Sequence, residues 1–299
     1  MRPAQRQTGH RRGPAAMGLV CLAALLLTGC AAHRNGSSAP GRAPGAGPDP
    51  APRVTTFAPT IESTDERLSQ ALLLLASKQG ADSHRRVAGE YSRLGILDMA
   101  HEHYTEAARL DPRDAGSFDA LARIWRDWGM PQIGLADAYR AVRLAPESAA
   151  AANTLGTLMQ STGQLRLARQ WYARAVALDP TAAYAINNFC YALIMLEQPD
   201  AVDACRNAVK AAPRSWVARN NLGLAYAADG DLVKAREQFK QVSSAAADYN
   251  MGILHMAMRE YRDAARQFGA ALNAAPQSTL IARRARAARL AADAAEGTR

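Results

Sequence analysis

Aromatic side chains are scarce in this 299-residue sequence, at 6% of all positions. So small a share argues against an aromatic-rich β-sandwich, whose strands favour such residues. Hydrophobic residues nevertheless make up 48% of the chain, and alanine contributes much of that share. Alanine favours helices and lets them approach closely, so the composition indicates closely packed helices with small contact residues.

Recognisable catalytic motifs are also absent. The sequence contains no Gly-x-Ser-x-Gly, no His-Glu-x-x-His and no glycine-rich phosphate loop. His101 and His103 lie two residues apart, so on a helix they point to different faces and are not expected to share a metal ion. We therefore expect no enzyme activity, no metal site and no cofactor.

The apolar run near the N-terminus is too short to span a membrane. It covers residues 17–27, whereas crossing roughly 30 Å of hydrocarbon takes about 20 residues. Four arginines precede the run without any acidic residue, and Thr28, Gly29 and Cys30 follow it. A basic segment, a short apolar core and small residues predict a secretory signal peptide over residues 1–29.

Residues 27–30, Leu-Thr-Gly-Cys, resemble the bacterial lipobox, in which cleavage occurs just before a lipidated cysteine. The resemblance implies that Cys30 carries lipid and anchors the protein to a membrane. Ala31 follows in place of an aspartate, which implies the periplasmic face of the outer membrane if the source has two membranes. The alternative is an ordinary secretory signal with a chance cysteine.

Residues 30–60 predict a disordered tether. Six prolines and four glycines fall in this stretch, and alanine supplies most of its apolar content. Such a segment cannot bury a core, so it is expected to hold the folded part near a membrane surface.

The net charge of +9 would ordinarily suggest a nucleic-acid partner. Four of the arginines belong to the predicted signal peptide, however, and the remaining 32 basic and 27 acidic residues leave +5. An RNA-binding helical repeat would need basic stripes along its whole groove. We therefore expect protein partners and no nucleic acid.

Proline spacing reveals an internal repeat beyond residue 60. Pro112, Pro146 and Pro180 are 34 residues apart, and Pro213 follows 33 later. Each proline closes a similar phrase, such as Ala-Val-Ala-Leu-Asp-Pro before residue 181. Because proline ends helices, each period is expected to hold two helices of roughly a dozen residues.

The repeat resembles the tetratricopeptide repeat, whose 34 residues run Leu-Gly-x-x-Tyr, then Ala-x-x-x-Phe, then Pro. Leu222, Gly223, Tyr226, Ala235 and Phe239 match this pattern in order. The resemblance implies an all-α solenoid, a right-handed superhelix of six repeats over residues 81–278. An N-terminal helix over residues 61–80 and a capping helix over residues 279–299 are expected at its ends.

The sequence departs from the repeat pattern at three places. The fourth repeat is one residue short near Pro199, and the junction before Asp248 has lost its proline and about five residues. A shorter connector is expected to alter helix stacking there. In the sixth repeat, His255 replaces the tyrosine and is expected to be a packed structural histidine.

Cysteine usage predicts one disulfide. After removal of Cys21 and lipidation of Cys30, only Cys190 and Cys205 remain, in an oxidising compartment. They are nearly equidistant from the turn of the fourth repeat, so an antiparallel hairpin brings them face to face. The alternative is two buried free thiols, and a redox-active pair is not expected because no Cys-x-x-Cys motif is present.

The first helices of the later repeats carry a recurrent asparagine. It resembles the asparagine ladder in the groove of O-linked N-acetylglucosamine transferase repeats, which implies that amides contact the backbone of a bound peptide. The alternative is that these asparagines only cap local backbone. The predicted peptide-binding groove comprises Asn153, Asn188, Tyr191, Asn221, Leu224, Asn250 and Ile253.

The first two repeats are rich in arginine. Arg85, Arg86, Arg123 and Arg126 predict a basic groove end that docks an acidic segment or a terminal carboxylate. The alternative is that these side chains are simply solvated. The lysine–asparagine pattern of the two-carboxylate clamp is not present.

Lipobox, tether and repeats together resemble the tetratricopeptide lipoproteins of tight-adherence and type IV pilus assembly. The resemblance implies a membrane-anchored scaffold in the cell envelope that binds extended protein segments and assists assembly of a pilus or secretion complex. An alternative function is an adaptor that recruits enzymes in cell-wall or outer-membrane biogenesis. The sequence makes no prediction of the oligomeric state.

Overall fold

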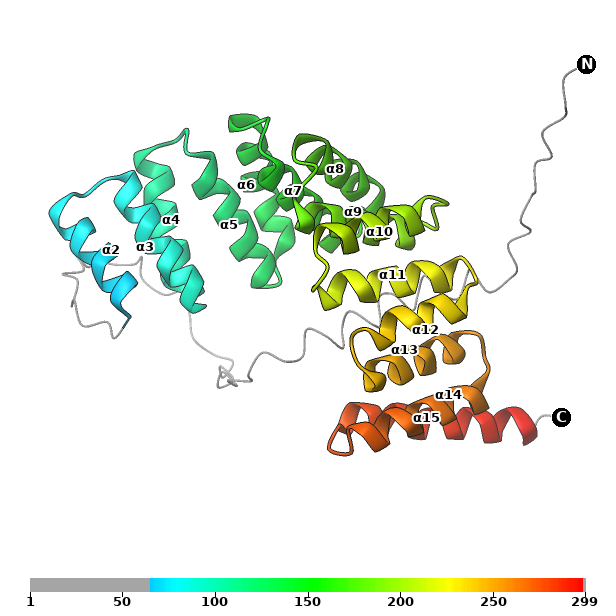
Figure 1. Cartoon of the computed structure of the whole chain (residues 1–299). Coiled ribbons are helices and arrows are strands. Elements are labelled where there is room, and N and C mark those ends of the chain that lie inside the picture. The colour runs from blue at the N-terminus through cyan, green and yellow to red at the C-terminus, as the bar shows by residue number, and fades with distance from the viewer. Residues whose placement is uncertain (1–64, 298–299) are drawn as a thin grey trace, which may run out of the picture. The chain divides into compact units, whose positions relative to one another are not determined.

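A computed structural model describes residues 65–297 of the chain, and within this range every regular element is an α-helix. The contacts divide these helices into an N-terminal unit ending at Gly163 and a C-terminal unit beginning at Gln164, and each is described by itself (Figure 1). None of the helices combines the length and hydrophobicity needed to cross a bilayer. The predicted signal peptide, Cys30 and tether lie outside the described residues.

The N-terminal unit contains six helices that pack in chain order. They are α2 (Glu66–Ser77), α3 (Ala81–Leu94), α4 (Leu97–Leu110), α5 (Ala115–Asp127), α6 (Pro131–Leu144) and α7 (Ala149–Ser161).

The C-terminal unit contains eight helices, again with neighbours in the chain packed side by side. They are α8 (Leu165–Leu178), α9 (Ala183–Met195), α10 (Ala201–Ala211), α11 (Trp216–Ala228), α12 (Leu232–Lys240), α13 (Ser244–Ala257), α14 (Tyr261–Ala274) and α15 (Thr279–Gly297).

Helix α2 is shorter than the 61–80 helix expected from the sequence. Its N-cap is Asp65, whose carboxylate accepts a hydrogen bond from the Leu68 amide at 3.0 Å. The same carboxylate pairs with Arg93 on α3 at 2.6 Å. Asp65 therefore both caps α2 and ties it to the next helix.

Alanine and glycine lie where the two helices of a pair approach each other. Gly223 on α11 faces the ring of Phe239 on α12, and Gly252 on α13 faces the ring of Phe268 on α14. Both phenylalanines are fully buried. The small-residue and aromatic positions of the repeat therefore form one interlocking contact, which explains the high alanine and low aromatic content.

Most turns within a helix pair use a left-handed glycine. Gly129, Gly163 and Gly230 have φ angles of 77°, 80° and 91°. In the fourth and sixth repeats the same place is taken by Glu197 and Arg259, with φ angles of 51° and 61°. A side chain disfavours this conformation, so packing around these two turns must hold the backbone there.

Helix α12 has only nine residues, whereas α8 and α14 have fourteen each. The shortening before Asp248 therefore falls at the C-terminal end of α12. A connector of three residues leads from α12 into α13. The altered stacking expected at this junction stays a prediction.

The predicted disulfide is present between Cys190 on α9 and Cys205 on α10, with their Cα atoms 4.9 Å apart. Both cysteines are fully buried. They occupy the interlocking contact of the fourth repeat, where the fifth repeat has Gly223 and Phe239. A covalent bond thus replaces a packed aromatic ring at this position.

The two neighbouring histidines of α4 face different partners, as their spacing predicts. The ring of His101 packs against Trp125 and Trp128, with centroids 4.9 and 5.1 Å away. Nδ1 of His103 lies 3.0 Å from Nδ1 of His84 on α3. This second contact needs one ring nitrogen to donate and the other to accept, so at least one of the two imidazoles must be neutral.

The His84–His103 pair makes stability depend on pH. Burial, and then the positive charge of a protonated His84, lower the pKa of His103 to about 4, although Glu106 opposes the shift. An unfolded chain protonates histidine near pH 6.5, so the unfolded state binds the proton first as the pH falls. We expect the free energy of unfolding to drop by about 1–2 kcal/mol between pH 6.5 and 4. This drop is smaller than the full pKa shift would give, because the ring is partly exposed to solvent.

Urea denaturation of the wild type and of His103→Gln at pH 7 and pH 5 checks this expectation. The variant should lose less stability than the wild type over the same interval. An equal loss in both proteins would show that other groups cause the pH dependence.

Candidate protein-binding surface

The recurrent asparagines connect consecutive first helices in the C-terminal unit. Nδ2 of Asn221 on α11 donates to Oδ1 of Asn187 on α9 at 3.0 Å. Nδ2 of Asn250 on α13 donates in the same way to Oδ1 of Asn220 on α11 at 2.7 Å. In each bond the donor is the recurrent asparagine of one repeat. The acceptor belongs to the preceding repeat and lies one residue before the recurrent position there. The asparagines therefore hold neighbouring repeats in register.

Most of the predicted groove residues are largely buried. The exposed fractions are 2% for Asn221 and 7% for Asn250. Tyr191, Leu224 and Ile253 are 8%, 2% and 3% exposed, and burial raises the pKa of Tyr191 to about 12. These side chains therefore offer little surface to a ligand, and their role as a peptide-binding groove stays a prediction.

Asn153 and Asn188 differ from the other predicted groove residues because they are half-buried. Among the described residues, no donor reaches Oδ1 of the buried Asn221. The residues one position earlier in the repeat, Asn187 and Asn220, lie nearer the surface. The Asn-Asn doublets at 187–188 and 220–221 are the sequence signal for this arrangement, since Asn187 and Asn220 accept these bonds and Asn221 donates one of them.

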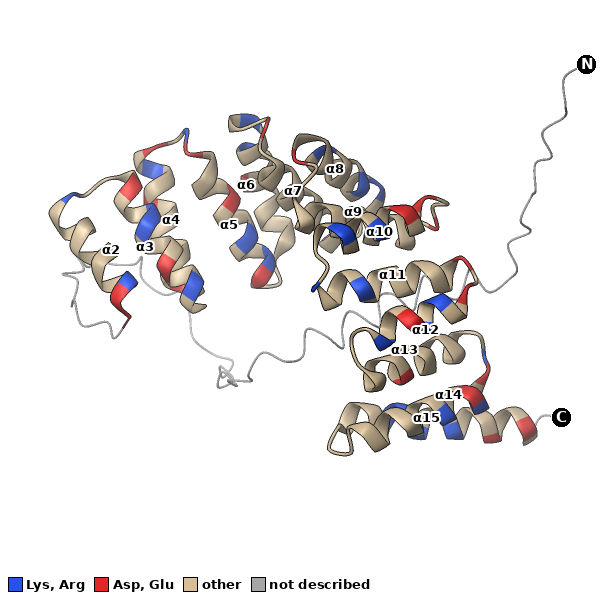
Figure 2. Cartoon of the chain, viewed as in Figure 1, with Lys and Arg blue, Asp and Glu red and all other residues tan. Residues whose placement is uncertain are grey.

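The predicted basic groove end is balanced by carboxylates within the N-terminal unit. Arg85 on α3 pairs with Asp82 and reaches Asp114, the N-cap of α5, at 3.1 Å. Figure 2 shows basic and acidic residues side by side along α3, α4 and α5. The other three predicted arginines also have acidic partners: Arg86 with Asp82 at 3.7 Å, Arg123 with Asp119 at 3.2 Å and Arg126 with Asp127 at 2.8 Å.

A carboxylate arriving from solvent would compete with partners already in place, although exposed pairs of this kind contribute at most about 1 kcal/mol each. Docking of an acidic segment at that end stays a prediction. Arg85 also has a structural role, because its contact with Asp114 ties α3 to the start of α5.

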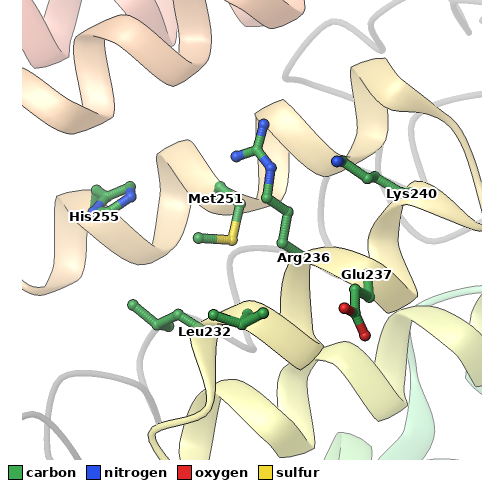
Figure 3. A pocket seen from close by; sticks show the side chains of 7 residues that line it. Leu232, Arg236, Glu237, Lys240, Met251 and His255 are labelled. Atoms are coloured by element: carbon green, nitrogen blue, oxygen red, sulfur yellow. The ribbon is translucent and has the colours of Figure 1, made fainter.

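A pocket of about 420 Å³ opens between α12 and α13, within the C-terminal unit. Its apolar lining comes from Leu232, Val233 and Met251, and its charged lining comes from α12 (Figure 3). The seven lining residues are Leu232, Val233, Arg236, Glu237, Lys240, Met251 and His255.

Two features give this pocket its charge. Arg236 is held in place because its guanidinium donates to Asp248 at 2.5 Å and to Gln267 at 2.9 Å. Lys240 is exposed on the last turn of α12. The pocket therefore combines an apolar surface with two basic side chains and one carboxylate, Glu237, from one helix. Sequence reasoning noticed the missing residues at this junction but did not predict a pocket, because the opening depends on how α12 and α13 pack.

No family model and no curated protein sequence matches this chain. Solved structures do match: PilW, described as a widely conserved type IV pilus biogenesis factor, is 20% identical with a TM-score of 0.59, over 68% of this chain and 96% of PilW. PilF of Pseudomonas aeruginosa is 16% identical with a TM-score of 0.55, over 66% of this chain and 93% of that protein.

A tetratricopeptide repeat protein of Parabacteroides merdae is likewise 16% identical, with a TM-score of 0.55, over 74% of this chain and 91% of its own. At these identities the likeness concerns the fold. The helix pairs, the glycine turns and these structural neighbours agree on one conclusion: the chain has the all-α fold of a tetratricopeptide-repeat solenoid.

Proposed function

We propose that this protein is a scaffold of the cell envelope that binds an extended segment of a partner protein and assists assembly of a pilus or secretion complex. The observation that carries the proposal is the pocket between α12 and α13. The sequence of the solenoid carries no recognised catalytic motif. The structural likeness to PilW, a type IV pilus biogenesis factor, supports the assembly role by analogy.

The pocket lining suggests what kind of segment binds. Leu232, Val233 and Met251 suit an apolar side chain, and Lys240, about two helical turns further along α12, suits a carboxylate elsewhere on the same segment. Met251 adds an adaptable surface because its side chain is unbranched and polarisable. A partner segment with one apolar anchor followed by an acidic residue fits both features.

The arginine pairs support a protein partner over RNA. Phosphate binding is favoured by excess positive charge along the groove, and the aspartates that face Arg85, Arg123 and Arg126 reduce that excess. Lipidation of Cys30 is part of the same proposal, because the Leu-Thr-Gly-Cys segment and the tether would place the solenoid next to a membrane.

Cross-linking and affinity capture from native membranes test this function. Val233→Glu or Lys240→Glu should weaken capture of the partner about tenfold, equivalent to about 1.4 kcal/mol, because each change alters an exposed part of the pocket. Leu290→Glu is the matched control, since Leu290 is 63% exposed on α15 and does not line the pocket. In the same cells, Cys30→Ala should move the protein into the soluble fraction.

Identification of the captured protein separates the two candidate roles. A pilus or secretion component supports the proposal, whereas an enzyme of cell-wall biogenesis supports the adaptor alternative. Capture that is equal for Val233→Glu, Lys240→Glu and the wild type would exclude the pocket as the binding site. Retention of Cys30→Ala at the membrane would exclude the lipid anchor.

A further inference from the structure

Three side chains that can bind metal converge at the turn between α13 and α14. His255 comes from the last turn of α13, Glu260 is the N-cap of α14, and Asp263 lies in the first turn of α14. One nitrogen or oxygen from each lies within 4.8 Å of the other two. Nδ1 of His255 and Oε2 of Glu260 are 2.6 Å apart. In residues 65–297 this is the single group of three such side chains with this geometry.

The backbone of this turn explains why the side chains meet. Arg259 has a φ angle of 61°, and its left-handed conformation reverses the chain immediately after α13. The Glu260 amide then donates to the His255 carbonyl at 2.9 Å, which brings Glu260 back beside the histidine. Asp263, one helical turn further along α14, adds the third side chain on the same side.

The fifth repeat has the same turn without the same chemistry. Tyr226 occupies the place of His255, Asp231 the place of Glu260, and Lys234 the place of Asp263, each 29 residues earlier. Lys234 pairs with Asp231 at 2.5 Å, so that turn carries an internal ion pair and one carboxylate. Compared with the fifth repeat, histidine replaces the tyrosine and aspartate replaces the lysine. These two differences change an ion-paired turn into a set of three potential metal ligands.

We propose that His255, Glu260 and Asp263 bind a divalent transition-metal ion of the zinc class. One imidazole nitrogen with two carboxylate oxygens is a donor set that zinc accepts, whereas calcium and magnesium prefer oxygen donors alone. A further coordination position would face solvent, since Glu260 and Asp263 are 47% and 38% exposed at their side chains. This proposal does not rest on the proposed partner binding.

Small movements bring the three donors to coordination geometry. Tetrahedral bonds of about 2.1 Å place donors about 3.4 Å apart, so the close His255–Glu260 pair opens while the other separations, all within 4.8 Å, need little change. Both carboxylates belong to partly exposed ion pairs and can reorient, while the imidazole is only 16% exposed and forms part of the α12–α13 pocket wall. His255 is thus the fixed ligand around which the carboxylates adjust.

Arg266 competes with the metal. Its guanidinium pairs with Asp263 and is itself 78% exposed. A bound cation would take over that carboxylate and release the arginine to solvent. Removal of Arg266 should therefore strengthen metal binding, a result that a purely structural ion-pair cluster does not predict.

Calorimetric titration of the tag-free full chain with Zn²⁺ tests the site, with Cys21 and Cys30 replaced by serine in every variant so that no thiol competes. We expect one ion per chain, a loss of affinity of at least about tenfold in His255→Gln and Glu260→Gln, and no comparable binding of Mg²⁺. Arg266→Gln should bind Zn²⁺ about two- to fivefold more tightly. Circular dichroism without metal shows that each variant retains its helices.

The His84–His103 pair provides the decisive control, because its two ring nitrogens are 3.0 Å apart and could also chelate zinc. His103→Gln should leave the zinc titration unchanged. The proposal is overturned if His103→Gln abolishes binding, if His255→Gln binds as the wild type does, or if the wild type takes up no zinc.

Discussion

Reduction of the Cys190–Cys205 disulfide should lower the free energy of unfolding by about 3 kcal/mol. The two cysteines are 15 residues apart, and a cross-link over a loop of this length restricts the unfolded chain by about that amount. The bond also replaces the interlocking glycine–aromatic contact of the fifth and sixth repeats, so reduction leaves the fourth repeat with two small thiols in the core. The turn of this repeat contains the left-handed Glu197, a conformation that the surrounding packing must hold.

Urea denaturation with and without a reductant measures this difference. The double variant Cys190→Ala/Cys205→Ala is the control, because its unfolding curve should not respond to reductant. A wild-type curve that is the same under both conditions would contradict the prediction. Two reactive thiols in the denatured, unreduced protein, counted apart from Cys21 and Cys30, would show that the bond does not form.

Gly223→Ala should destabilise the protein by about 1–3 kcal/mol, although alanine is the better helix former. A Cβ atom at residue 223 would lie within 2.9 Å of three ring carbons of Phe239, which is fully buried and has no space to withdraw. Overpacking of this kind outweighs the gain in helix propensity of up to about 1 kcal/mol. Gly252→Ala should behave in the same way against Phe268.

Gly269→Ala is the matched control for this effect. Gly269 also lies inside a helix, α14, but a Cβ atom there would meet nothing within 4 Å. We expect this variant to gain about 0.5–1 kcal/mol from helix propensity alone. Thermal denaturation of the three variants separates the two effects, and a Gly223→Ala protein as stable as Gly269→Ala would refute the close contact with Phe239.

The candidate binding surface shows which features the repeat pattern predicts and which it does not. The spacing of Asn188, Asn221 and Asn250 correctly marks one position of each first helix, but the pattern does not say whether that position faces solvent or the next helix. Asn221 and Asn250 face the neighbouring repeat, where amide–amide bonds replace contact with water. The proposed zinc-class site is a similar case, since the repeat pattern predicts His255 as a packed histidine and assigns no role to Glu260 and Asp263.

Local signals in the sequence by themselves determined the helix pairs, the glycine turns, the period of the repeat and the pairing of Cys190 with Cys205. These features follow from residues close in the chain, because proline, glycine and the 3.6-residue period act over a few residues. Only the tertiary structure decided which asparagines are buried, which aspartates neutralise the arginines and where the α12–α13 pocket opens. Those outcomes depend on how one helix packs against the next, and burial and charge pairing are set by that contact rather than by spacing along the chain.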